Sequence, residues 1–199
     1  MKKLLLLAAL TAGAAHAETT GVYGGVGFYD NTLTTEVAGA GDVDFSQRAV
    51  SIIAGYDIMD YVAVEARFSF GTSDDSISST VVADKKETYT RVTGSEGPSQ
   101  AIFAKFKYSP IDQVELYALA GIRHSVGSVE VYSKTDGSLN GRATGEDSTT
   151  GLAYGAGVGY EITKGFTVSA EYLALPDFKD GDETVAEHDG FGLVATYKF

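Results

Sequence analysis

The C-terminal segment constrains the fold more than any other part of the chain. Apolar residues occupy every second position there: Phe191, Leu193, Ala195, Tyr197 and the final residue, Phe199. A period of two places these side chains on one face of a β-strand and the intervening residues on the other face. The sequence therefore predicts a chain that ends in a strand with one continuous apolar face.

Seven earlier segments show the same alternation. In each of them one row is apolar and free of charge, while the other row carries glycines, hydroxyl groups and charges. The eight segments span residues 22–28, 50–56, 62–70, 102–108, 114–122, 154–160, 168–174 and 191–199. A soluble barrel would turn the apolar rows inward and a membrane barrel would turn them toward lipid, so alternation alone leaves both arrangements open.

The N-terminus favours export and so favours the membrane barrel. Met1–Lys3 is positively charged, Leu4–Leu10 is apolar, and Ala15–Ala17 reads Ala-His-Ala. This order is typical of a secretory signal peptide, and the apolar run is shorter than the roughly 20 residues of a spanning helix. We expect a signal peptide over residues 1–17, cleaved after Ala17, and one domain over residues 18–199.

The connections between the eight segments alternate in length. Three are tight, at residues 57–60, 109–112 and 161–165, and contain the Asp, Ser, Pro and Gly that favour turns. Four are long, at residues 30–46, 72–98, 124–149 and 176–189. This pattern predicts an all-β fold: an eight-stranded antiparallel up-and-down transmembrane β-barrel with short periplasmic turns and four long extracellular loops.

Three stretches carry a resemblance to a known family. They are Gly55–Arg67, where a Gly-Tyr turn leads into a strand with an inward acid, Tyr117–Gly121, and Gly155–Tyr160. With them the chain resembles small eight-stranded outer-membrane barrels of the OmpA/OmpX and opacity-antigen type. The resemblance implies a porin-like, multi-pass protein of the bacterial outer membrane, inserted by the barrel-insertion machinery. It also implies that Phe199, with Tyr197 and Ala195 on the same face, is the insertion signal.

Three tyrosines precede the tight turns at equal intervals. Tyr56, Tyr108 and Tyr160 all lie on apolar rows. Tyrosines at such positions fit an aromatic belt, with the ring in lipid and the hydroxyl at the headgroups. We therefore expect the three rings at the periplasmic interface.

Charged residues of the strands share the rows that would face the lumen. They are Glu65, Arg67, Lys105, Lys107, Glu115, Arg123, Glu171 and Lys198. An eight-stranded barrel leaves room only for side chains, and a dry charge must be paired. We expect an ion-pair network that plugs the lumen, with glycines 155, 157 and 159 leaving room for long side chains from the opposite wall. A narrow ion-conducting path is the alternative.

The four long loops carry a formal charge of about −13, against −12 for the whole chain, so the net charge lies in the loops. Such an acidic surface argues against nucleic acid as a partner. Asp180-Gly181-Asp182 begins like a calcium-binding loop, but the later acidic ligand at the required spacing is missing. The sequence predicts no metal site and no cofactor, and a solvated last loop.

Catalysis requires a nucleophile and an oriented base. His124 and Ser125 are adjacent and so point to opposite faces of a strand, and His188 lies among acids, where a solvated histidine is expected. A lipid-modifying enzyme is thus the least favoured function. The most favoured is a monomeric structural or surface-interaction barrel, acting in adhesion or host-defence evasion through its loops. Its expected partners are the lipid bilayer, lipopolysaccharide, the insertion machinery and an unidentified surface or host ligand.

Overall fold

The computed structural model describes residues 21–37, 41–83, 86–180 and 183–199. The predicted signal peptide and the Gly181-Asp182 part of the calcium-like sequence lie outside these residues. All regular structure in the described part of the chain is β-strand. No helix in this part is long and apolar enough to cross a membrane.

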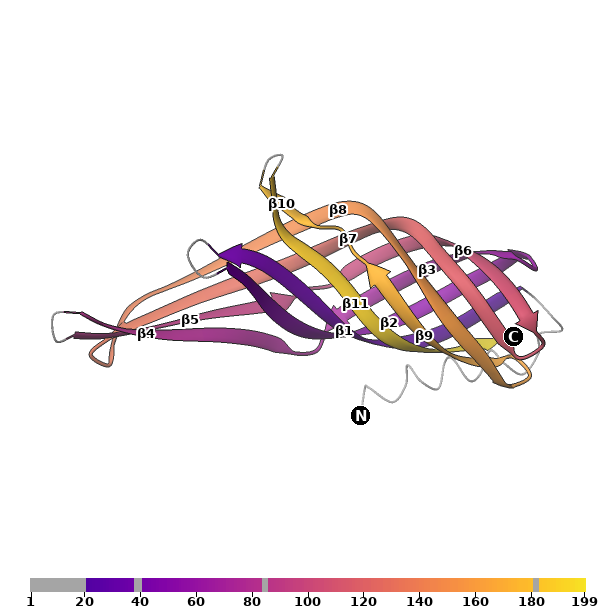
Figure 1. The fold of residues 1–199 in the computed structure, drawn as a ribbon, viewed down its shortest axis with the longest axis horizontal. Helices are drawn as coiled ribbons and strands as arrows, with labels where there is room; N and C mark the ends of the chain where they lie inside the picture. The colour runs from indigo at the N-terminus through magenta and orange to yellow at the C-terminus, as the bar shows by residue number, and fades with distance from the viewer. Residues whose placement is uncertain (1–20, 38–40, 84–85, 181–182) are drawn as a thin grey trace.

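Eight strands form a closed ring in which each is antiparallel to both neighbours (Figure 1). In ring order they are β1 (Val22–Val37), β2 (Gly41–Met59), β3 (Val62–Gly71), β6 (Ser99–Ile111), β7 (Val114–Thr135), β8 (Ser138–Thr163), β9 (Phe166–Ala174) and β11 (Glu183–Lys198). The C-terminal strand β11 pairs with β1 and so closes the ring. The predicted eight-stranded antiparallel barrel is confirmed.

The apolar rows face outward. In β3, Ala63, Glu65 and Arg67 are buried. Val64 and Phe68, on the alternate positions of the same strand, are exposed. The other ring strands repeat this arrangement, with Phe28 61 % exposed on β1 and Ile53 1 % exposed on β2. An interior that holds charges and an exterior that holds large apolar side chains is the inverse of a soluble barrel.

Tight turns join the ring strands at one end. They lie at Asp60-Tyr61, Asp112-Gln113 and Lys164-Gly165, within or next to the predicted segments. Gly165 adopts a φ of 81°, a left-handed conformation that glycine reaches without steric cost. These turns mark the periplasmic end of the barrel.

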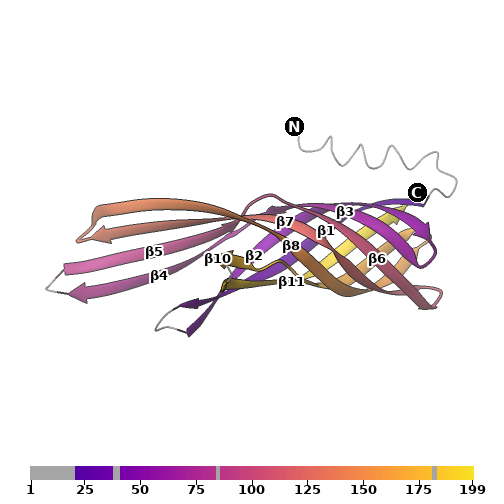
Figure 2. The same ribbon diagram turned by 90° about the horizontal axis from the view of Figure 1, so that it is seen from above.

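The opposite end is more ordered than the sequence suggested. Residues 72–98 and 124–149, predicted as loops, are largely strand: β4 (Asp74–Ala83) pairs with β5 (Lys86–Glu96), and β5 pairs with the outer part of β7. With the outer part of β8 they form a four-stranded sheet that projects from the ring (Figure 2). We call this β4-β5-β7-β8 sheet the extension.

The loop prediction failed because these segments lack an uninterrupted apolar row. Their alternate positions hold Ser, Thr and Val, which favour strands through β-branching and cross-strand hydroxyl contacts rather than through burial. Two such contacts are Thr88 with Thr135 at 3.0 Å and Ser95 with Ser128 at 2.7 Å. In the last connection a short strand, β10 (Phe178–Asp180), pairs with β11.

Candidate functional site: the lumen and the extracellular vestibule

An arginine held between two glutamates occupies the middle of the lumen. The guanidinium of Arg67 donates to Glu65 through Nε and to Glu171 through both terminal nitrogens, with Nη2 2.9 Å from Oε2. Each of the three residues is at most 5 % exposed, and Arg67 lies over the ring of Phe103 at 5.1 Å. Opposite charges that pair directly need no water, so this group fills the lumen as a dry ion-pair cluster with one more carboxylate than cation.

Three inward tyrosines complete this group. Tyr23 donates to Glu65 at 2.8 Å, and Tyr29 and Tyr117 donate to Glu171 at 2.9 Å each. With the arginine, these hydroxyls satisfy the carboxylates without water. Tyr23 and Tyr117 lie in the predicted strands 22–28 and 114–122, but neither was predicted to belong to the network.

Each of these tyrosine rings lies over a glycine directly across the ladder. A Cβ atom on Gly157 would lie 2.3 Å from Cζ of Tyr117, and one on Gly55 would lie 2.0 Å from Cζ of Tyr23. The expectation that glycines make room for side chains from the opposite wall was therefore wrong at Gly157. Room is made instead for the ring on the adjacent strand, because Tyr117 is the ladder partner of Gly157.

Nearer the periplasmic end, three lysines form ion pairs with carboxylates. Lys105 lies 3.0 Å from Glu115, and both Lys107 and Lys198 lie 2.6 Å from Asp57. Lys198 is half exposed, so this last group forms the rim of the lumen rather than its interior. Asp57 was predicted to be part of a turn, and its partners show that it also belongs to the lumen.

At the extracellular end, Arg123 pairs with Glu96. The distance is 2.6 Å, and both side chains are at most 6 % exposed. Asn31 donates to the other oxygen of Glu96 at 2.7 Å, and Ser99 and Ser125 accept from Arg123. Glu96 was assigned to a long loop, so the sequence missed it. With Asp57 and Glu96 included, the described lumen holds five acids paired with the five predicted bases.

The residues predicted for the membrane interface lie on the outer surface. Tyr56, Tyr108 and Tyr160 are 54 %, 67 % and 50 % exposed near the tight turns. Tyr197 is 40 % exposed, and its ring meets that of Phe199 edge-on at 5.4 Å. Their roles in an aromatic belt and in insertion stay predictions.

Above the Arg123–Glu96 pair, the barrel mouth contains a cavity of about 360 Å³, which we call the vestibule. Leu33, Val126 and Val129 contribute apolar residues to its lining, and Gln47, Glu146 and Asp147 contribute polar ones. His188 lines it from β11 and is 6 % exposed, so the prediction of a solvated histidine was wrong. Burial, together with nearby Arg123, lowers the pKa of His188 to about 3, so the imidazole is neutral at neutral pH.

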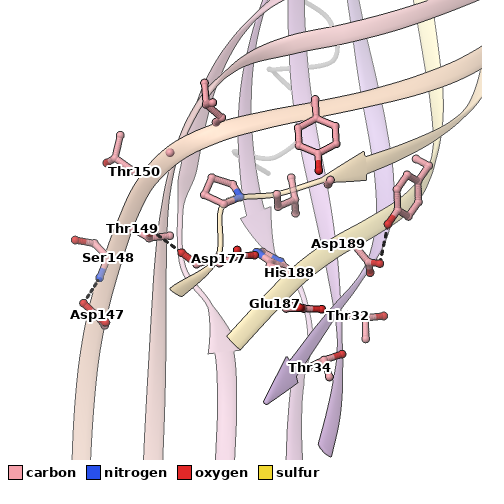
Figure 3. A pocket seen from close by; sticks show the side chains of 17 residues that line it. Thr32, Thr34, Asp147, Ser148, Thr149, Thr150, Asp177, Glu187, His188 and Asp189 are labelled. Carbon is pink, nitrogen blue, oxygen red and sulfur yellow. Dashed lines mark hydrogen bonds between the residues drawn. The ribbon is translucent and has the colours of Figure 1, made fainter. Parts of the chain in front are cut away.

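A second cavity of about 670 Å³, which we call the outer groove, lies on the outside of the wall at the same height. Leu152, Tyr154 and Tyr172 line its part nearer the membrane. Asp147, Asp177, Glu187, Asp189 and several hydroxyl groups line its upper, extracellular part, and Figure 3 labels these side chains. His188 and Asp147 line both cavities. Within the described residues, no group of three or more His, Cys, Asp or Glu side chains is arranged to hold a metal ion.

The histidine considered for catalysis lies on the outer surface. His124 is exposed, and its Nδ1 lies 2.8 Å from Oγ1 of Thr150. Ser125 is 1 % exposed, faces the lumen and accepts a hydrogen bond from Arg123. The two side chains therefore point to opposite sides of the wall, as the alternation predicted.

A closed ring of eight strands with paired charges inside and apolar side chains outside is the architecture of an outer-membrane barrel. The sequence matches the family described as "Outer membrane protein beta-barrel domain" over residues 3–199. The chain belongs to this family. No curated protein sequence matches the chain.

Solved structures of outer-membrane barrels share the fold at low sequence identity. The attachment invasion locus protein Ail of Yersinia pestis is 17 % identical, with 91 % of this chain and 100 % of Ail covered and a TM-score of 0.53. Neisserial surface protein A is 18 % identical, with 92 % and 100 % covered and a TM-score of 0.50. The N-terminal barrel of Pseudomonas aeruginosa OprF is 15 % identical, with the same coverage and TM-score. These likenesses support the fold of this family member.

Proposed function

We propose that this outer-membrane barrel is a surface-interaction protein that binds an extracellular partner through the extension. After export and cleavage behind Ala17, the ring spans the bacterial outer membrane, surrounded by lipid and lipopolysaccharide. The extension then projects into the extracellular medium, and its strands β7 and β8 continue directly from the barrel wall. Binding residues are commonly presented in this way, at the end of a rigid scaffold.

The observation that carries this proposal is the contrast between the lumen and the extension. The lumen residues satisfy one another, with Arg67, Glu65 and Glu171 nearly inaccessible to solvent. The extension instead exposes both side chains and backbone, such as Val82 at 70 % and Val129 at 47 %. Ail is an attachment invasion protein by its name and shares this fold, which is consistent with a role at the cell surface.

Shortening the extension tests the proposal. Residues 76–93 and residues 130–144 are each replaced by an Asn-Gly turn. The two new residues take the places of a ladder pair, Ser76 with Thr93 in one hairpin and Glu130 with Thr144 in the other. Cells that carry the shortened protein should lose binding to immobilised matrix or complement proteins, relative to cells with the full chain. The shortened barrel must still reach the outer membrane and migrate differently when boiled.

Two outcomes of this experiment decide whether the extension binds the partner. Loss of binding with an intact barrel supports the proposal, and unchanged binding by the shortened protein overturns it. Detergent sensitivity of the same strains separates a role in membrane integrity from surface binding, because integrity depends on the ring and not on the extension.

A narrow ion path is the second candidate, since charges occur along the whole length of the lumen. The direct pairing of Arg67 with Glu65 and Glu171 weighs against it. Discrete single-channel currents from the full chain in planar bilayers, altered by Glu171→Gln, would favour the channel over the sealed barrel.

A further inference from the structure

The barrel wall is interrupted near its extracellular end. Strand β9 ends at Ala174, which pairs with Tyr154 of β8 on one side and with Asp189 of β11 on the other. Above this level β8 pairs with β7, and β11 continues with β1 and β10. A seam therefore separates β8 from the chain that follows β9.

The seam is filled by a short segment instead of a ladder. Leu175 and Pro176 are buried in it. The backbone N of Leu175 donates to the carbonyl of His188 at 2.9 Å, and Oγ1 of Thr149 donates to the carbonyl of Asp177 at 3.0 Å. Between β8 and this segment, a hydroxyl–carbonyl contact thus takes the place of the backbone ladder that joins β8 to β9 below it.

The vestibule and the outer groove lie on the two sides of this seam. His188 and Asp147 line both cavities, so the wall here is about one side chain thick. Figure 3 shows His188 in the middle of the groove lining. Where all eight ladders of the ring are present, the wall is a hydrogen-bonded sheet, which no side-chain movement can open.

The surroundings of the vestibule limit what it can hold and where an occupant can go. Below it lie Arg123 and Glu96, whose pairing blocks the way to the periplasm. Leu33 and Val129 favour an apolar occupant, and a volume of about 360 Å³ suits a small molecule. The lower end of the groove opens beside Leu152, which is 76 % exposed on the lipid-facing surface.

We propose that the vestibule, the seam and the outer groove form a lateral passage for small, uncharged, apolar molecules between the medium and the outer leaflet. Movement of Leu175 and of the His188 side chain opens the passage while the ladders on either side stay paired. The acids of the upper groove repel anions, and a neutral His188 presents no charge to an apolar solute. This inference goes beyond surface binding, which requires no passage.

A disulfide across the seam tests the proposal, because the chain contains no cysteine. The pair Thr149→Cys and Asp177→Cys replaces two residues that already touch. The matched control is Val131→Cys with Ala143→Cys, ladder partners in the extension whose spacing suits a disulfide. The probe is N-phenyl-1-naphthylamine, an uncharged apolar fluorophore, added to cells that lack or carry each protein.

The full chain should raise the rate of probe uptake several-fold over the strain without it. The oxidised seam pair should return uptake to the background rate, and reduction should restore it. The oxidised control pair should leave uptake unchanged. Wild-type uptake by cells whose seam pair is fully oxidised would overturn the proposal, and so would a full chain that does not accelerate uptake at all.

A second variant keeps the test valid if the cysteine pair fails to fold. A side chain added at Gly145 meets no atom within 4 Å of its Cβ and enters the vestibule, so Gly145→Phe should slow uptake. Gly141→Phe is its control, because Gly141 is equally open but does not line the vestibule. Equal uptake by the two variants would overturn the passage. Binding of matrix proteins, measured on the same cells, reports separately on the surface-interaction role.

Discussion

Replacing Arg67 with glutamine should be the most destabilising single change in the lumen. The substitution removes the pairing with Glu65 and Glu171 and the hydrogen bond to the hydroxyl of Tyr29, which is 2.7 Å long. Two carboxylates then remain buried without a cation. Removing one member of a buried ion pair costs about 3–5 kcal/mol. Glu171→Gln should cost less, because Arg67 still has Glu65 to balance it.

The assay is urea unfolding of the barrel in lipid vesicles, followed by circular dichroism since the chain has no tryptophan. With a slope of about 2 kcal/mol per molar urea, the Arg67→Gln midpoint should fall by about 2 M. Lys198→Gln is the matched control, because its pair with Asp57 is half exposed and contributes about 1 kcal/mol or less. Equal midpoints for the two variants would refute the argument that the central group is dry and tightly coupled.

Three further outcomes are expected. The purified protein should require detergent or lipid and migrate differently on gels when boiled; identical migration would contradict a closed barrel. Deleting Phe199, or Tyr197→Asp, should leave cleavage after Ala17 intact but strand the chain in the periplasm, which cell fractionation would show; normal outer-membrane levels would remove the insertion role. His188 has a folded pKa below its unfolded value, so its contribution to stability is present above pH 6.5 and is lost as pH falls toward 3. Over that range the free energy of unfolding of the wild type should therefore fall by up to about 1.4 kcal/mol per pH unit relative to that of His188→Gln. Parallel plots of the free energy of unfolding against pH for the two proteins would contradict the burial of the imidazole.

The sequence predicted the ring well because lipid imposes a strict period on it. Every apolar row must face outward along its whole length, so the alternation identifies the strands, and the predicted signal peptide then assigns the apolar rows to the outside. The lumen was predicted in part: the bases were found on their strands, but Asp57 and Glu96 were not recognised as their partners. These acids lie where strands meet turns or extensions, and pairing there depends on strand tilt and stagger, which the period does not reveal.

The extracellular end was predicted poorly for a related reason. No lipid enforces a pattern there, so strands made of Ser, Thr and Val looked like loops. His188 looked solvated because acids surround it in sequence. In the structure its position in β11 turns it inward, while Glu187 and Asp189 on either side face outward. Alternation extended three residues before the predicted strand 191–199 would have indicated this.

The continuity of β7 and β8 has a mechanical consequence. β7 pairs with β6 inside the ring and then with β5 beyond it. Its ladder with β8 runs from Val114 to Thr135, with one register shift near the tip, between Ser133 and Lys134. A pull on the tip of the extension is therefore directed along the strands and loads many backbone hydrogen bonds at once, in shear. A tether attached through a flexible loop would instead peel bonds one at a time. The tip is thus anchored against tension by the same ladder that closes the wall.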